Sequence, residues 1–196
     1  MRALLAAPLL FVVANCSLLQ GARPARPKAV CQRAKVSGPF CLVLQAIGDD
    51  RLRATLCNRS DKKQTYLYGG LIQPTKLLLT GADGKALESS DDRMIMKFDN
   101  TVYRSLYSDL APKACTQLIE SRLTTSGGAY HLDWSAYRFS GVAPGRYRAQ
   151  LAFEHTEDRW FEGDRSEPQK AKRGKMQGLW KGALTSNIVV LTLPNP

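Results

Sequence analysis

The chain has 196 residues, which is enough for one domain of ordinary size plus a short additional segment. A hydrophobic content of 44% allows a real core to form, and after residue 14 no apolar run approaches the length that a membrane-spanning helix needs. The excess of 28 Lys and Arg over 17 Asp and Glu gives a net charge of +11, which is found in exported proteins that meet anionic surfaces and also in soluble proteins without such a partner.

The first sixteen residues are typical of an export signal. Arg2 gives a positive start, and Ala3–Ala14 is a mostly apolar run that is too short to cross a bilayer. The end of this run, VANC, is similar to the bacterial lipobox, in which the cysteine (here Cys16) receives lipid, although Asn15 replaces the usual small residue. We expect residues 1–16 to direct export, with either lipidation of Cys16 or ordinary cleavage, to the periplasm, the envelope or the medium.

Residues 17–35 form a basic segment with two prolines and no hydrophobic period. This composition predicts an extended linker or N-terminal arm. If Cys16 carries lipid, the arm tethers the protein to a membrane; otherwise no membrane contact is implied. Residues 36–196 are predicted to form a single domain.

The chain contains five cysteines: Cys16, Cys31, Cys41, Cys57 and Cys115. Removal or lipidation of Cys16 leaves four, and an even number in an exported chain favours two disulfides over metal ligation. No pair has the CxxC spacing of a zinc or redox site. Of the three pairings, Cys31–Cys41 with Cys57–Cys115 is preferred because both loops are then simple and unnested. Buried thiols are the alternative.

The first predicted hairpin consists of Phe40–Ile47, a Gly-Asp-Asp turn and Arg51–Asn58. The second strand alternates, with three apolar residues on one face and Cys57 on the polar face, so a disulfide there is expected to lie outside the core. The sequence Asn58-Arg-Ser60 matches a glycosylation acceptor, and we treat this match as chance because the signal is of bacterial type.

Turn signals and short apolar runs predict further strands at Gln64–Tyr68, Lys76–Thr80, Arg93–Phe98, Leu110–Ile119 and Ser186–Leu193. The Asp83-Gly84 pair after the second of these is a hairpin signal. Two methionines and a phenylalanine share one face of Arg93–Phe98, and we interpret them as core residues. Ser126–Gly128 is expected to be flexible.

The strongest strand signal lies in residues 146–154, after a turn with the sequence VAPG. Tyr147, Ala149, Leu151 and Phe153 alternate with polar residues, which is typical of a half-buried strand. We expect the other strands to pack around this one. A tyrosine near the start of such a strand is similar to the tyrosine corner of immunoglobulin-like sandwiches.

About seven to nine short strands with frequent turns and no convincing helix predict an all-β, antiparallel, immunoglobulin-like sandwich. The segments LRATLCNRSD, TGADGKAL, SDLAPKACTQL and DWSAYRFSGVAPGRYRAQLAFE, within Leu42–Glu154, resemble immunoglobulin-like domains of exported bacterial proteins. They are similar to the non-catalytic domain that precedes the protease domain in some bacterial lysine-specific metalloendopeptidases. The resemblance implies the fold and an exported setting, but not catalysis, because no protease domain follows.

A loop of about thirty residues, 155–185, interrupts the strand pattern and is long enough to suggest a function. Its basic residues and flanking tryptophans form the predicted binding set: Trp160, Arg165, Lys170, Lys172, Arg173, Lys175 and Trp180. Cations beside aromatic rings suit an anionic polymer or a membrane surface. The alternative is a solvated hairpin extension whose tryptophans cap the sandwich.

Three functions are weighed for this chain. The preferred one is a non-enzymatic, cofactor-free exported protein that contacts an anionic envelope component or a protein partner through the 155–185 loop, without specific nucleic-acid binding. The second is a protease inhibitor or pro-domain-like module. The third is a metal-dependent enzyme that uses His131, Asp133 and His155. The sequence has neither the HExxH nor the GxSxG motif.

Overall fold

The computed structural model describes residues 27–33, 38–67, 75–91, 106–135, 137–155, 159–162, 172–175 and 179–195. These residues form one helix and fourteen strands, and every strand pair is antiparallel. The elements are α1 (Pro27–Arg33), β1 (Phe40–Ile47), β2 (Arg51–Asn58), β3 (Gln64–Leu67), β4 (Thr75–Thr80), β5 (Ser90–Asp91), β6 (Tyr107–Leu110), β7 (Cys115–Ser126), β8 (Ala129–Trp134), β9 (Tyr137–Val142), β10 (Gly145–His155), β11 (Arg159–Glu162), β12 (Lys172–Lys175), β13 (Gly182–Thr185) and β14 (Val189–Leu193). The all-β, antiparallel prediction is confirmed.

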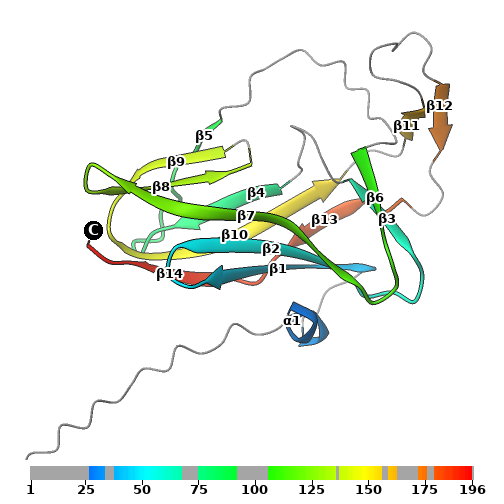
Figure 1. Ribbon diagram of the computed structural model, residues 1–196, viewed down its shortest axis with the longest axis horizontal. Helices are drawn as coiled ribbons and strands as arrows, with labels where there is room; N and C mark the ends of the chain where they lie inside the picture. The colour runs from blue at the N-terminus through cyan, green and yellow to red at the C-terminus, as the bar shows by residue number, and fades with distance from the viewer. Residues whose placement is uncertain are drawn as a thin grey trace, which may run out of the picture.

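Two sheets enclose one core (Figure 1). The first sheet has the strand order β1-β2-β7-β8-β9-β5. In the second sheet, β10 pairs with β4 along one edge. Along its other edge, the first half of β10 pairs with β14 and the second half pairs with β13. The core takes side chains from both sheets, so the architecture is sandwich-like. Two separate ribbons, β3–β6 and β11–β12, complete the described strands.

The strand at the centre of the second sheet is the one that the sequence indicated most strongly. Ala149 and Leu151 of β10 are fully buried and Phe153 is 2% exposed, whereas Tyr147 is half-buried. The hydroxyl of Tyr147 donates a hydrogen bond of 2.8 Å to the carbonyl of Ala143, four residues upstream. The period-two pattern therefore identified both the position of the strand and the face that it buries.

The β1–β2 hairpin separates a large core from a smaller one. The apolar face of β2 enters the main core, with Leu52 and Leu56 fully buried. Cys57 lies on the opposite face, as predicted, but it is also buried because α1 covers it. This second cluster contains Cys31, Cys41, Val43 and Cys57, with Val30 and Cys115 packed against it. The disulfides therefore lie outside the main core but not in solvent.

The prediction of an extended arm without helix over residues 17–35 is wrong for Pro27–Arg33, which forms α1. Proline suits the first helical position because its fixed φ is helical and its missing N–H has no partner there in any case. A helix of seven residues is not stable alone in water. Its disulfide to Cys41 and the packing of Val30 supply the missing stabilisation, and neither has a periodic sequence signal.

The strand count exceeds the predicted seven to nine because several strands are only two to four residues long. A long meander also replaces what looked like separate pieces: β7 extends over twelve residues and turns directly into β8. Gly127 and Gly128 both have positive φ, 59° and 76°, as a two-residue hairpin turn requires, so the flexibility expected at Ser126–Gly128 is instead a defined turn. The predicted strand Arg93–Phe98 lies outside the described residues.

The described helix has seven residues, so no helix in the described part of the chain is long and apolar enough to cross a bilayer.

Candidate functional site

Four cysteines on the face of the first sheet opposite the main core form two neighbouring disulfides. Cys31 is bonded to Cys41 and Cys57 to Cys115, which confirms the pairing preferred from the sequence. Cys41 is the register partner of Cys57 across β1 and β2, and Cys57 is the partner of Cys115 across β2 and β7. Three cysteines therefore form one row across adjacent strands, and Cys31 joins this row from α1.

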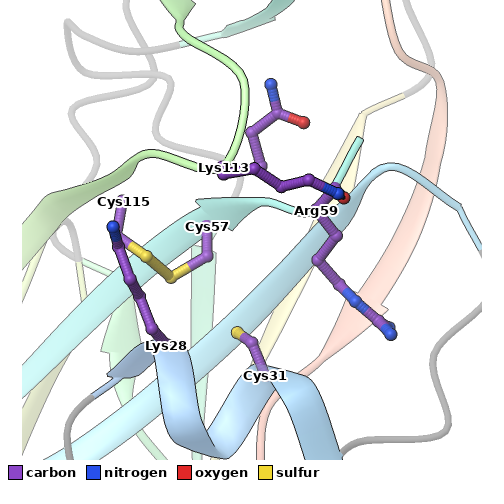
Figure 2. Close-up of a pocket in the computed structure, with 7 residues that line it drawn as sticks. Lys28, Cys31, Cys57, Arg59, Lys113 and Cys115 are labelled. Carbon is purple, nitrogen blue, oxygen red and sulfur yellow. A yellow bond between two sulfur atoms is a disulfide. The ribbon is translucent and has the colours of Figure 1, made fainter. Parts of the chain in front are cut away.

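A pocket of about 490 Å³ opens beside these disulfides, and we call it the disulfide pocket. It is lined by Lys28 and Cys31 from α1, by Cys57, Asn58 and Arg59 at the end of β2, and by Lys113 and Cys115 at the start of β7. Figure 2 shows Lys28 beside the Cys57–Cys115 disulfide, with Lys113 and Arg59 across the opening. The lining has three cationic side chains and no carboxylate, so its electrostatic potential favours an anionic occupant.

Turns at the ends of β2 and β7 hold the cations of the pocket. The Nζ atom of Lys113 lies 3.0 Å from Oδ1 of Asp61 and donates to the carbonyl of Arg59 at 2.6 Å. The backbone N–H of Arg59 donates to the carbonyl of Pro39 at 2.6 Å. Asp61 is 91% exposed, so water screens its attraction for Lys113 and the pocket stays positive.

The predicted basic loop contains the two-stranded ribbon β11–β12. Its register pairs Arg159 with Lys175, Trp160 with Gly174, Phe161 with Arg173 and Glu162 with Lys172. Residues directly opposite one another in an antiparallel pair lie on the same face, and so do residues two apart along a strand. One face of the ribbon therefore carries three cationic residues and a phenylalanine. Figure 1 shows the ribbon at one end of the molecule, apart from both sheets.

The ribbon contains four residues of the predicted binding set: Trp160, Lys172, Arg173 and Lys175. Arg165 and Lys170 lie outside the described residues. Trp180 lies elsewhere, with its ring centroid 5.6 Å from that of Phe40 and 5.9 Å from that of Phe153. These contacts make Trp180 part of the packing at the edge of the core, the role that the alternative interpretation gave to the tryptophans. A contribution of Trp180 to binding stays a prediction.

The structure does not bring His131, Asp133 and His155 together. The first two lie on β8 of the first sheet, and His155 lies on β10 of the second. Asp133 accepts a hydrogen bond of 2.7 Å from Arg138, and His155 is buried with Nδ1 2.9 Å from the carbonyl of Trp180. Across the ranges that the structure describes, no group of three or more His, Cys, Asp or Glu side chains is placed to hold a metal ion.

Sequence reasoning missed the three cations of the disulfide pocket because they come from distant parts of the chain. A signal for them did exist. Lys28 is three residues before Cys31, Arg59 is two residues after Cys57, and Lys113 is two residues before Cys115. The Cys57–Cys115 disulfide brings Arg59 and Lys113 together. Lys28 joins them because Cys41, to which Cys31 is bonded, lies opposite Cys57 in the β1–β2 hairpin, so the pairing together with this register predicts the positive pocket.

Comparisons with known proteins supply no template for either feature. No protein-family model matches the sequence, and no curated protein and no solved structure matches the chain. The resemblance to exported immunoglobulin-like domains therefore stays a prediction.

Proposed function

We propose that this chain is a non-enzymatic exported protein of the bacterial envelope that binds an anionic envelope component through the basic ribbon of the 155–185 loop. The observation that carries the proposal is the register of β11 and β12, in which Arg159 lies directly opposite Lys175. Like charges directly opposite one another destabilise a strand pair. A two-stranded ribbon is also only marginally stable by itself. An anion on this face would neutralise the repulsion and stabilise the ribbon.

The chemistry of the ribbon suits an extended anionic surface rather than a single small ion. Arg159, Arg173 and Lys175 share the face with Phe161, and an aromatic ring beside cations suits a boundary between polar headgroups and an apolar layer. The net charge of +11 adds a long-range attraction to such a surface. The Tyr147 hydrogen bond to Ala143 supports the immunoglobulin-like resemblance, because a tyrosine corner makes a bond of this kind.

Co-sedimentation with lipid vesicles tests this proposal. The mature protein is expected to bind vesicles that contain phosphatidylglycerol more strongly than vesicles of phosphatidylcholine, and the difference should shrink as NaCl is raised. A triple variant that removes the cations of this face, Arg159→Ser, Arg173→Ser and Lys175→Ser, should lose most of the binding. At about 1 kcal/mol per cation near an anionic surface, the loss is on the order of a hundredfold.

The matched control removes three exposed cations from the body of the sandwich: Lys76→Ser, Lys85→Ser and Arg146→Ser. This variant has the same net charge as the ribbon variant and should retain most of the binding. Equal losses in the two variants would show that only total charge matters and would overturn the ribbon as the contact surface. Binding that does not depend on salt would instead favour the alternative function, in which this chain is an inhibitor that binds a protease.

A further inference from the structure

We propose that the disulfide pocket is a thiol–disulfide exchange site that takes a small thiol or a peptide thiol bearing a negatively charged group. The pocket is independent of the basic ribbon. It combines a half-buried cysteine of a disulfide that lines an open pocket, a cationic wall, and a second disulfide in the same row.

The first feature is access to sulfur. Cys31, Cys57 and Cys115 all line the pocket, but only Cys115 is half-buried, whereas Cys31 and Cys57 are each 3% exposed. An attacking thiolate must approach one sulfur of the pair directly. Cys115 is therefore the sulfur that an external thiol meets first, and Cys57 is the leaving group.

The second feature is the charge of the wall. Lys28, Arg59 and Lys113 line the same pocket as the Cys57–Cys115 disulfide (Figure 2). Cations stabilise thiolates, and thiolates are the reactive form of both the attacking and the departing sulfur. The same cations attract a carboxylate or sulfonate on the incoming molecule. The wall therefore selects for anionic thiols over neutral and cationic ones.

The third feature is the row of cysteines across β1, β2 and β7. The incoming thiolate attacks Sγ of Cys115, forms a mixed disulfide with it and releases Cys57 as a thiolate. Cys57 faces Cys41 across the β1–β2 ladder. Directly opposite residues have Cα atoms about 4.5–5.5 Å apart, which lies within the range that a disulfide spans.

The thiolate of Cys57 can therefore attack Sγ of Cys41, form a Cys41–Cys57 disulfide and release Cys31 as a thiolate, which water then protonates. Each step exchanges one disulfide for another, so no external oxidant or reductant is needed. The outcome at the level of the fold is the loss of the covalent link between α1 and β1, because Cys31–Cys41 is that link.

The test compares two small thiols of opposite charge, 2-mercaptoethanesulfonate and cysteamine, on the full mature protein at low salt. Adducts are located by non-reducing peptide mapping after acid quenching. The rate at which each thiol forms an adduct with the protein is divided by the rate of its reaction with the neutral 2-hydroxyethyl disulfide. This ratio removes differences in intrinsic reactivity between the two thiols. We expect the normalised rate to favour the anionic thiol on the order of tenfold, with the first adduct at Cys115 and with the preference lost in 0.5 M NaCl.

Two variants sharpen the test. The pair Lys28→Gln and Lys113→Gln should abolish the preference for the anionic thiol, whereas the matched pair Lys76→Gln and Lys85→Gln should leave it unchanged. Equal normalised rates for the two thiols on the wild-type protein, or a first adduct at a cysteine other than Cys115, would overturn the exchange site.

The second exchange step has its own readout. In Cys115→Ser, Cys57 has no disulfide partner, and we expect mapping to find a Cys41–Cys57 disulfide with Cys31 open to alkylation in a measurable fraction of molecules. The wild-type protein treated with 2-mercaptoethanesulfonate should give the same cross-link, which keeps the test valid if the variant does not fold. An intact Cys31–Cys41 disulfide in both samples would overturn the second step.

Discussion

At the scale of single residues, Asn58 is the side chain on which the wall of the disulfide pocket depends. It is 2% exposed, and its Nδ2 atom donates to the carbonyls of Lys62, Leu110 and Ala111 at 2.8, 3.0 and 3.1 Å. Its Oδ1 atom accepts from both the backbone N–H and the hydroxyl of Ser60. The amide thus joins the end of β2 to the turn before β7. Because the nitrogen is buried and bonded, a glycan at this position is incompatible with the fold.

Replacement of Asn58 by Asp is expected to lower the free energy of unfolding by about 2–3 kcal/mol. The carboxylate oxygen that takes the place of Nδ2 cannot donate, so the buried carbonyl of Leu110 and the partly buried carbonyls of Lys62 and Ala111 lose this donor and face a negative charge. Chemical denaturation at neutral pH measures the change. Ser60→Ala is the milder control. It leaves the Asn58 donor in place and removes only the hydroxyl contacts of Ser60 with Asn58, Lys62 and Gln64, which lie at an exposed or partly buried turn, so it should cost about 1 kcal/mol. A loss in Asn58→Asp no larger than that of the control would contradict this role.

At the scale of elements, two residues before β14 connect the two sheets. Asn187 accepts from the N–H of Leu44 at 3.0 Å and donates to the carbonyl of the same residue at 2.9 Å, as a paired strand residue would. Its neighbour Ser186 makes the equivalent pair of bonds to Leu151, through its backbone N–H and its hydroxyl oxygen. The exposed edge of β1 is thereby bonded to the segment that also pairs with β10. This contact covers part of an edge that would otherwise be open to pairing with another chain.

Replacement of Asn187 by Ala should therefore lower the free energy of unfolding by about 1–2 kcal/mol, since two hydrogen bonds are lost at a partly buried site. Amide hydrogen exchange gives a more specific readout: the N–H of Leu44 should exchange faster, while the amides of β2 that face β7 should not change. Asn195→Ala, an exposed asparagine near the C-terminus, is the control. Unchanged protection of Leu44 in Asn187→Ala would mean that β1 does not depend on this contact.

The elements also show which parts of the fold a sequence can predict. Residues 146–154 were predictable because burial on one face of a strand imposes a period of two on neighbouring residues. The helix α1 was not, because seven residues are too few to show a period and its stability comes from a disulfide. The contact of Asn187 with Leu44 joins residues 143 positions apart, and nothing local marks it. The basic ribbon was visible as composition, but its register follows only from the paired strands.

At the scale of the whole molecule, cations outnumber carboxylates, and two carboxylates beside the start of β2, Asp50 and Glu120 of β7, are each shared between two arginines. Glu120 lies 2.7 Å from Arg53 and 3.2 Å from Arg51, and the hydrogen bond from Arg53 holds the pKa of Glu120 below its ordinary value of 4.5. Asp50 is likewise 2.7 Å from Arg122. These local pairs leave a net charge of +11 over the whole chain, so repulsion among the remaining cations acts against the folded state.

Added salt should consequently stabilise the fold while it weakens binding to an anionic surface. Raising ionic strength from 0.01 to 0.15 M shortens the Debye length from about 30 Å to about 8 Å, which screens repulsion between distant cations more than contacts of 2.7 Å. A gain on the order of 1 kcal/mol corresponds to a rise of about 2–4 °C in Tm for a chain of this size. Thermal unfolding followed by circular dichroism measures this rise.

The Lys76→Ser, Lys85→Ser and Arg146→Ser variant, with three fewer positive charges, should gain less. A fall in Tm over the same range would mean that the Arg53–Glu120 and Arg122–Asp50 pairs outweigh the general repulsion among the cations.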